Sequence, residues 1–190
     1  MRIGVLALQG AFGEHVAVLR RLGADAAEIR QARDFDRGFD GIVLPGGEST
    51  AMGRLMRSLG LLEPVRDALL AGLPAFGTCA GLILLAKRFT DSQPVHLGVM
   101  DVEVCRHGYG RQLGSFATEG RFAGEAGVPM VFIRGPYVAA AGTGVEVLGE
   151  TGGKIVAVRQ GRLLATAFHP ELTGDDRVHS YFLRMVRRER

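Results

Sequence analysis

The chain has 190 residues, of which 47% are hydrophobic and 23% are charged. This length and composition suffice for one sizeable core, so we expect a single domain over residues 1–190 and exclude an intrinsically disordered protein. The formal net charge of +3, from 23 basic and 20 acidic residues, is too small to predict a nucleic-acid or membrane partner.

The cysteine content and the apolar runs limit the class of protein further. Cys79 and Cys105 are the two cysteines, and they form no C-x-x-C motif, so neither a disulfide framework nor structural zinc is predicted. The first apolar stretch ends after Leu8 and favours a buried strand over a secretory signal. The run around 82–86 is far shorter than the roughly 20 residues that span a bilayer. We therefore expect a cytoplasmic protein in which one cysteine can act as a nucleophile.

The first ninety residues alternate between short apolar runs and helical patterns. The runs at 3–8, 26–29, 41–44 and 74–77 predict strands. Helical spacing predicts helices at 12–22, 50–59, 62–70 and 80–87, with Ser49 as a cap of the second. This alternation is typical of a parallel sheet with right-handed crossovers and helices on both faces.

From about residue 95 the pattern changes to short strands separated by glycine-rich turns. Strands are predicted at 99–104, 128–133, 145–148, 155–159 and 163–168, with a hairpin over 154–164. We expect this half to extend the same sheet. A basic helix is predicted at 176–187, and a solvated helix face accounts for the arginines at 184, 187, 188 and 190.

The strongest chemical signal is Gly77-Thr78-Cys79-Ala80-Gly81, between a predicted strand and a predicted helix. It has the G-x-nucleophile-x-G pattern of a nucleophile elbow, in which glycines allow a strained turn and close packing. The following helix directs its positive N-terminal end toward the sulfur of Cys79, which favours the thiolate. The alternative is a buried, inert cysteine.

A cysteine nucleophile needs a base and a group that orients that base. His169-Pro170-Glu171 follows a predicted strand, where alternate side chains point to the same side. Glu171 could hold one imidazole nitrogen of His169 and leave the other nitrogen for Cys79. The other histidines, at 15, 96, 107 and 179, lack such a neighbour, and solvated positions suit most of them.

The segment Pro45-Gly46-Gly47-Glu48-Ser49 follows a strand and opens a helix. Its glycines leave backbone N–H groups free to face an oxyanion, and the N–H of Ala80 is the usual second donor. A plain glycine-rich turn is the alternative. A P-loop is excluded because no Gly-Lys-Ser/Thr follows.

These segments together carry a resemblance over essentially the whole chain. They are, in order, Ala7-Leu8-Gln9-Gly10-Ala11, Glu14-His15, Pro45-Gly46-Gly47-Glu48-Ser49-Thr50, Gly77-Thr78-Cys79-Ala80-Gly81, Tyr109-Gly110-Arg111-Gln112, Phe132-Ile133-Arg134 and Phe168-His169-Pro170-Glu171-Leu172-Thr173. The chain resembles the PdxT (SNO) family, the glutaminase subunits of pyridoxal phosphate synthase, within the class I glutamine amidotransferases.

The resemblance implies a flavodoxin-like three-layer α/β sandwich with a mixed, mainly parallel sheet. It implies hydrolysis of L-glutamine to glutamate and ammonia through a thioester, without metal or organic cofactor. Cys79, His169 and Glu171 would form the triad, and Gly47 and Ala80 the oxyanion hole. The residues implied to contact glutamine are Gly47, Glu48, Ser49, Arg106, Ile133 and Arg134.

The implied partner is the PdxS synthase subunit, which receives the ammonia to build pyridoxal phosphate, with Gln9 near the contact. The sequence departs from the family at Arg106-His107-Gly108-Tyr109-Gly110-Arg111-Gln112, where Arg-Asn-x-Phe-Gly-Arg-Gln is usual. It also has Ile133-Arg134-Gly135-Pro136 in place of Ile-Arg-Ala-Pro. Both arginines remain, and an arginine suits a bidentate grip on an α-carboxylate.

Three other functions remain open at this point. One is a different triad hydrolase on the same fold, such as a γ-glutamyl hydrolase or the glutaminase subunit of another synthase. Another is a catalytically inactive binding domain, against which the intact set of Cys79, His169 and Glu171 argues. The third is a nucleic-acid binder, which the weak positive charge allows but no recognisable module supports.

Overall fold

A ten-stranded mixed sheet forms the centre of the computed structural model, which describes residues 1–36, 38–108 and 114–187. Its parallel part has the order β2-β1-β3-β4-β12. These strands are Asp25–Ile29, Arg2–Leu6, Gly41–Leu44, Ala75–Thr78 and Leu163–Thr166. β3, β4 and β12 are buried at every residue, as predicted for strands that are covered on both faces.

The antiparallel part continues from β12 through β11, β9 and β6, and β5 pairs with β6 in parallel at the edge. The bounds are Lys154–Gln160 for β11, Tyr137–Ala141 for β9, Met100–Cys105 for β6, Ala86–Phe89 for β5 and Glu146–Thr151 for β10, which pairs with β11. The predicted hairpin over 154–164 is confirmed as β11–β12.

The hairpin of β7 (Ser115–Phe122) and β8 (Glu125–Ile133) forms a separate two-stranded sheet. The prediction that the whole second half extends the main sheet is therefore wrong for this segment. Its strand pairing is satisfied within the hairpin, and β8 ends at the site described below.

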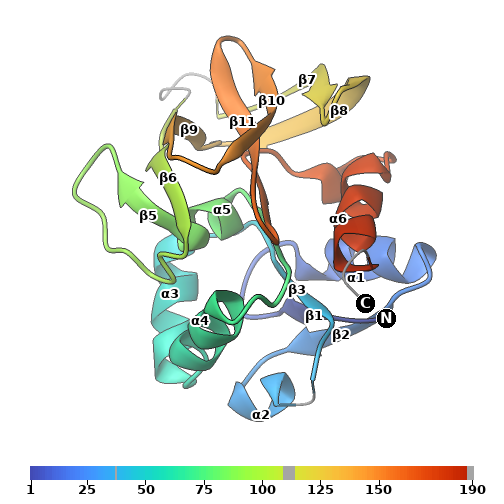
Figure 1. The fold of residues 1–190 in the computed structure, drawn as a ribbon, viewed down its shortest axis with the longest axis vertical. Coiled ribbons are helices and arrows are strands. Elements are labelled where there is room, and N and C mark those ends of the chain that lie inside the picture. The colour runs from blue at the N-terminus through green and yellow to red at the C-terminus, as the bar shows by residue number, and fades with distance from the viewer. Residues whose placement is uncertain (37, 109–113, 188–190) are drawn as a thin grey trace.

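The helices cover both faces of the sheet and create three layers (Figure 1). α1 and α6 lie on one face, while α3, α4 and α5 lie on the other. The bounds are Phe12–Arg21 for α1, Ala32–Phe35 for α2, Ser49–Ser58 for α3, Leu62–Leu70 for α4, Ala80–Leu85 for α5 and Arg177–Arg187 for α6, with a 3₁₀ turn, η1, at Pro170–Leu172. The helix predicted at 80–87 ends earlier, because the chain leaves it at Leu85 to pair as β5.

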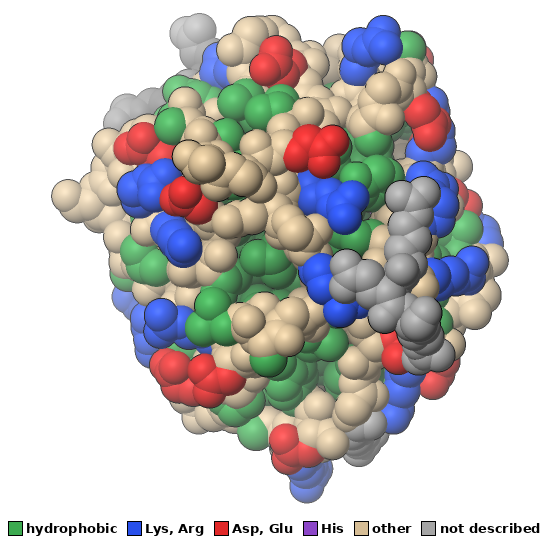
Figure 2. All heavy atoms as spheres, viewed as in Figure 1, with side chains coloured by type: hydrophobic (Ala, Val, Ile, Leu, Met, Phe, Trp, Pro, Cys, Tyr) green, Lys and Arg blue, Asp and Glu red, His purple; other side chains and the backbone are tan. Residues whose placement is uncertain are grey.

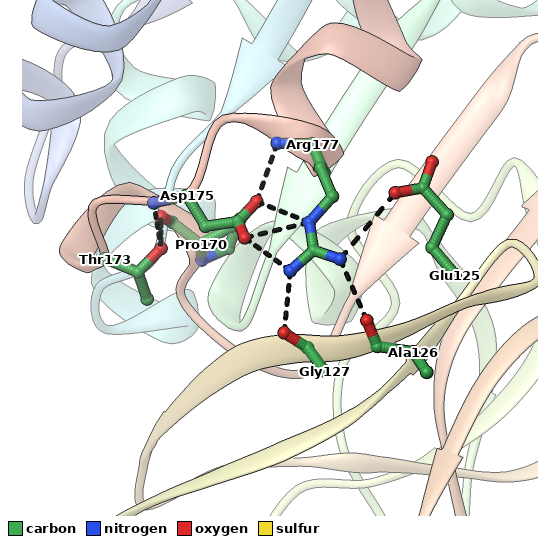
Figure 3. Close-up of polar contacts among 7 residues, drawn as sticks. All are labelled: Glu125, Ala126, Gly127, Pro170, Thr173, Asp175 and Arg177. Atoms are coloured by element: carbon green, nitrogen blue, oxygen red, sulfur yellow. Dashed lines mark hydrogen bonds and ion pairs between the residues drawn. The ribbon is translucent and has the colours of Figure 1, made fainter.

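A contact centred on the partly exposed Arg177 holds the β7–β8 hairpin against the start of α6 (Figure 3). The Arg177 guanidinium donates to the carbonyl oxygens of Ala126 at 2.9 Å and Gly127 at 2.7 Å. The same group bonds the Asp175 carboxylate at 2.6 Å and lies 3.7 Å from that of Glu125. The hairpin is thus anchored beside the segment that carries His169.

Within the described residues, no helix combines the length and the apolar character needed to cross a membrane. Over most of the face drawn in Figure 2, basic and acidic side chains lie interspersed.

Candidate active site

Cys79 lies at a sharp turn between β4 and α5, the nucleophile elbow of residues 77–81. Its backbone has φ +48° and ψ −98°, a strained conformation for a residue other than glycine. Its N–H donates to the carbonyl oxygen of Thr166 at 2.8 Å. A Cβ at Gly81 would lie 2.0 Å from the carbonyl oxygen of Leu44, so only glycine fits where the elbow passes β3. The predicted strand–turn–helix context is confirmed.

His169 and Glu171 follow β12, and His169 lines the same pocket as Cys79. His169 Nδ1 is 2.7 Å from Glu171 Oε1, and both side chains are buried. The backbone N–H of His169 donates to the carbonyl oxygen of Val131 at 2.8 Å, so β8 fixes the position of the imidazole. Its Nε2 makes no hydrogen bond with the described residues.

The imidazole of His169 and the carboxylate of Glu171 each stabilise the charged form of the other. Burial disfavours the charged imidazole, but the neighbouring Cys79 and Glu171 outweigh burial and raise the pKa of His169 to about 10. Burial also disfavours the carboxylate, yet His15 and His169 hold the pKa of Glu171 well below its usual value. The site therefore favours an imidazolium beside an ionised carboxylate.

The segment of residues 45–49, here the oxyanion loop, lies next to the elbow at the end of β3. The Gly46 carbonyl oxygen accepts from the N–H of Ala11 at 3.1 Å, and a Cβ on Gly46 would lie 2.2 Å from the His169 ring. The side chain of Gln9 accepts from the N–H of Glu48 at 2.6 Å. Gln9 is exposed at this position and directly restrains the loop.

Glu48, rather than Ser49, caps α3, so the predicted cap is wrong by one residue. The Glu48 carboxylate accepts from the N–H groups of Thr50 at 3.0 Å and Ala51 at 2.7 Å. Burial opposes its charge, but these two donors and the nearby Arg106 lower the pKa of Glu48. Ser49 is the first helical residue, and its hydroxyl instead accepts from the Arg106 guanidinium at 2.9 Å.

A single pocket of about 480 Å³ brings these groups together. Its walls include nearly all residues that the sequence singled out, together with a few neighbours: Gln9, Gly10, Ala11, Gly46, Gly47, Glu48, Ser49, Cys79, Ile83, Arg106, His107, Ile133, Arg134, Pro136, His169 and Leu172. Ala80 is buried directly behind Cys79 as the first residue of α5, and Glu171 is buried behind His169. The structure confirms that these residues lie close together, whereas their roles stay predictions.

Ile133 and Arg134 reach the pocket from the end of β8. The Ile133 carbonyl oxygen lies 4.0 Å from the sulfur of Cys79, and its side chain is 41% exposed. Arg134 has φ +45°. The segment Tyr109-Gly110-Arg111-Gln112, which contributed to the resemblance, lies outside the described residues, as do Arg188 and Arg190.

The expectation of solvated positions for the remaining histidines is wrong for His15, His96 and His179, which are all buried. His107 alone among them is exposed. His15 lies 3.4 Å from Glu171, so it belongs to the surroundings of the site. Glu14-His15 contributed to the family resemblance, but no local pattern predicts the contact of His15 with Glu171, because the two residues come from distant segments.

The comparisons with known proteins agree with this geometry. The model of the SNO glutamine amidotransferase family matches residues 5–188. The pyridoxal 5'-phosphate synthase subunit PdxT of Streptococcus pneumoniae (strain ATCC 700669 / Spain 23F-1) is 52% identical over 190 residues, covering 98% of each chain. A crystal structure of a glutamine amidotransferase is 46% identical, with a TM-score of 0.90 over 97% of this chain and 98% of that one.

A more distant solved structure shares the fold alone. The structure of PurLQS from Thermotoga maritima superposes with a TM-score of 0.67 at 15% identity, covering 97% of this chain and 94% of that chain. The three-layer α/β architecture with a mixed sheet is thus common to proteins whose sequences have diverged widely.

Proposed function

The chain belongs to the SNO glutamine amidotransferase family, and we propose that it hydrolyses L-glutamine to glutamate and ammonia with Cys79, His169 and Glu171. The observation that carries the proposal is the buried His169–Glu171 pair, with Nδ1 and Oε1 2.7 Å apart, beside a strained cysteine in the same pocket. An imidazole held in this way is oriented to serve a cysteine nucleophile.

The reaction starts with attack of the Cys79 thiolate on the carboxamide carbon of glutamine. The N–H groups of Gly47 and Ala80 stabilise the tetrahedral oxyanion, and each such donor typically contributes about 10²–10³ in rate. His169 protonates the departing nitrogen, so ammonia leaves and a thioester remains on Cys79. His169 then takes a proton from water, whose oxygen attacks the thioester to release glutamate and regenerate the thiolate. Glu171 keeps the imidazole oriented during both steps.

The glutamine backbone would be held at the other end of the pocket. Arg106 lies there with its guanidinium against Ser49 and Glu48, and Arg134 enters from the end of β8. Planar guanidinium groups suit a bidentate contact with the α-carboxylate. Glu48 can accept from the α-ammonium group, and Ile133 lines the path to the sulfur.

The same proposal includes a partner protein. The relatives at 52% identity are named as subunits of pyridoxal 5'-phosphate synthase. We take the partner to be the PdxS synthase subunit, which would consume the ammonia to build pyridoxal phosphate. Gln9 lies at the exposed edge of the pocket, bonded to the N–H of Glu48, so a partner that docks there could reorganise the oxyanion loop.

A glutaminase assay of the purified chain with and without the PdxS subunit tests both the proposed hydrolysis of glutamine and its dependence on the partner. We expect slow hydrolysis by the chain alone and a rise in kcat of about tenfold or more with the partner, as for completion of an oxyanion hole. γ-Glutamyl peptides serve as control substrates and should not be hydrolysed. Full activity without the partner would refute the coupling, whereas hydrolysis of the peptides and not of glutamine would refute the substrate.

A further inference from the structure

Behind Glu171, on the side away from the pocket, three polar side chains form a fully buried cluster. They are His15 from α1, Thr78 from β4 and His179 from α6, and none has measurable solvent exposure. His15 Nε2 lies 3.1 Å from Thr78 Oγ1, and its Nδ1 lies 2.9 Å from His179 Nε2. Buried polar groups cost stability unless they are bonded, so such a cluster on three separate elements needs a reason.

The contact between this cluster and the triad is made by His15. Its Nε2 is 3.4 Å from Glu171 Oε2, and both side chains are inaccessible to solvent. Glu171 Oε1 is bonded by His169, whereas Oε2 has no hydrogen bond of ordinary geometry within the described residues. His15 is thus the polar side chain that faces this oxygen.

The surrounding bonds assign the proton on the His15 ring. Burial lowers the pKa of His179 to about 3, so His179 is neutral and has one N–H group. His179 Nδ1 is buried with no partner among the described residues, and a buried N–H is left unbonded more rarely than an acceptor is. His179 Nε2–H therefore donates to His15 Nδ1. This leaves His15 Nε2–H to donate toward Glu171 and Thr78.

From these contacts we infer that His15 is a positioning residue for the proposed glutaminase reaction, holding Glu171 against His169 from behind. This inference rests on the proposed function of the triad. Through Thr78, the residue before Cys79, His15 also braces the strand end that carries the nucleophile. One side chain thereby fixes the distance between the two halves of the triad.

The chain next to α1 also bonds the oxyanion loop, so the helix that carries His15 contacts a second part of the site. The N–H of Ala11, just before α1, donates to the carbonyl oxygen of Gly46 in the oxyanion loop at 3.1 Å. His15 lies one helical turn further along the same helix and packs toward η1, which carries Glu171. A shift of α1 would therefore disturb the oxyanion loop and the carboxylate together.

The test compares His15→Gln with His15→Asn in the chain assembled with its synthase partner. The amide nitrogen of glutamine can occupy the place of Nε2 and donate to Glu171, whereas that of asparagine falls at the place of Nδ1 and cannot reach it. We expect His15→Asn and His15→Leu to lower kcat by about ten- to a hundredfold, as for a misplaced catalytic group. KM for glutamine should change less than about twofold, and His15→Gln should recover most of kcat.

Val16→Ala provides the matched control, because Val16 is buried on the same helix next to His15 and its apolar side chain cannot donate to Glu171. It should lower the unfolding temperature and leave kcat unchanged. Equal kcat for His15→Gln and His15→Asn, or a loss of kcat shared by Val16→Ala, would overturn the positioning role.

Cys79→Ala, assayed beside them, separates this inference from the proposed function. Inactive Cys79→Ala together with wild-type kcat in His15→Asn overturns the positioning role alone. Active Cys79→Ala overturns the proposed triad and the role of His15 with it.

Discussion

The nucleophile elbow and the oxyanion loop follow adjacent strands of one sheet, β4 and β3, but different forces hold them in place. The elbow is buried, and Gly81 contacts the backbone of Leu44 without room for a Cβ. In the oxyanion loop, Gly47 and Glu48 are exposed, and the Gln9 side chain and the Ala11 N–H bond it.

This difference separates the tasks of the two segments. In the proposed reaction the attacking sulfur must keep its position, and close packing of backbone against backbone provides that rigidity. The oxyanion donors act only while charge develops, so a loop held by a few polar contacts can be rearranged by substrate or partner. We therefore expect substitution of the packed elbow glycine Gly81 to affect folding as well as chemistry, and substitution of the exposed loop glycine Gly47 to affect chemistry alone.

The largest effect is expected for Cys79→Ala. The thiolate is a reactant, so glutamine hydrolysis should be lost, while the circular dichroism spectrum and unfolding temperature stay near those of the wild type. Cys105→Ser is the matched control, since Cys105 is only half-buried and lies outside the pocket. Labelling of Cys105 rather than Cys79 by an electrophilic glutamine analogue would contradict the assignment.

Glycine substitutions compare the two segments directly. Gly81→Ala should lower the free energy of unfolding by about 3 kcal/mol, the upper end for an overpacked site, because the Leu44 backbone must move. A Cβ on Gly47 meets side chains and no backbone, with the Gln9 amide oxygen at 2.4 Å and the Met52 sulfur at 3.2 Å, so Gly47→Ala should change that free energy by less than about 0.5 kcal/mol. Chemical denaturation measures both, and equal losses would refute the contrast.

Arg106→Ala should lower kcat/KM for glutamine, because Arg106 lines the pocket beside the oxyanion loop. We expect a loss of about 1.5–3 kcal/mol, roughly 10- to 150-fold in kcat/KM, the usual worth of a charge-assisted hydrogen bond. Arg134→Ala should act in the same direction, and Lys should rescue either only in part. Arg88→Ala is the control, since Arg88 pairs with Asp101 away from the pocket. An unchanged kcat/KM in both variants would remove these arginines from the site.

The smallest effect concerns the pH dependence of stability. The raised pKa of His169 stabilises the fold fully below about 6.5, its ordinary value, and this contribution is lost as the pH rises toward 10. The lowered pKa of Glu171 stabilises the fold above about 4.5 and is lost on acidification. The difference in unfolding free energy between the wild type and Glu171→Gln should therefore be largest between about pH 4.5 and 6.5.

Denaturation from pH 5 to 9 measures that difference, with Glu63→Gln on the exposed side of α4 as the control. A difference that stays constant between pH 6.5 and 9 would contradict the pairing of His169 with Glu171.

The sequence by itself determined the parallel half of the sheet and the principal site residues. β3 and α4 begin and end where the apolar patterns predict, because strands covered on both faces and amphipathic helices have strong local signals. Cys79 and the His169–Glu171 pair were likewise predicted from local patterns, since an elbow needs its glycines and a strand places alternate residues on one side.

Only the tertiary structure decided the features that depend on distant partners. β5 and β9 became strands by pairing with β6, although their own residues carry a weak pattern. His15 contacts Glu171 although the two residues are 156 positions apart in the chain, and the residues next to His15 do not predict that contact. Local propensity acts over a few residues, whereas burial and hydrogen bonding are satisfied by whichever segments the fold brings together.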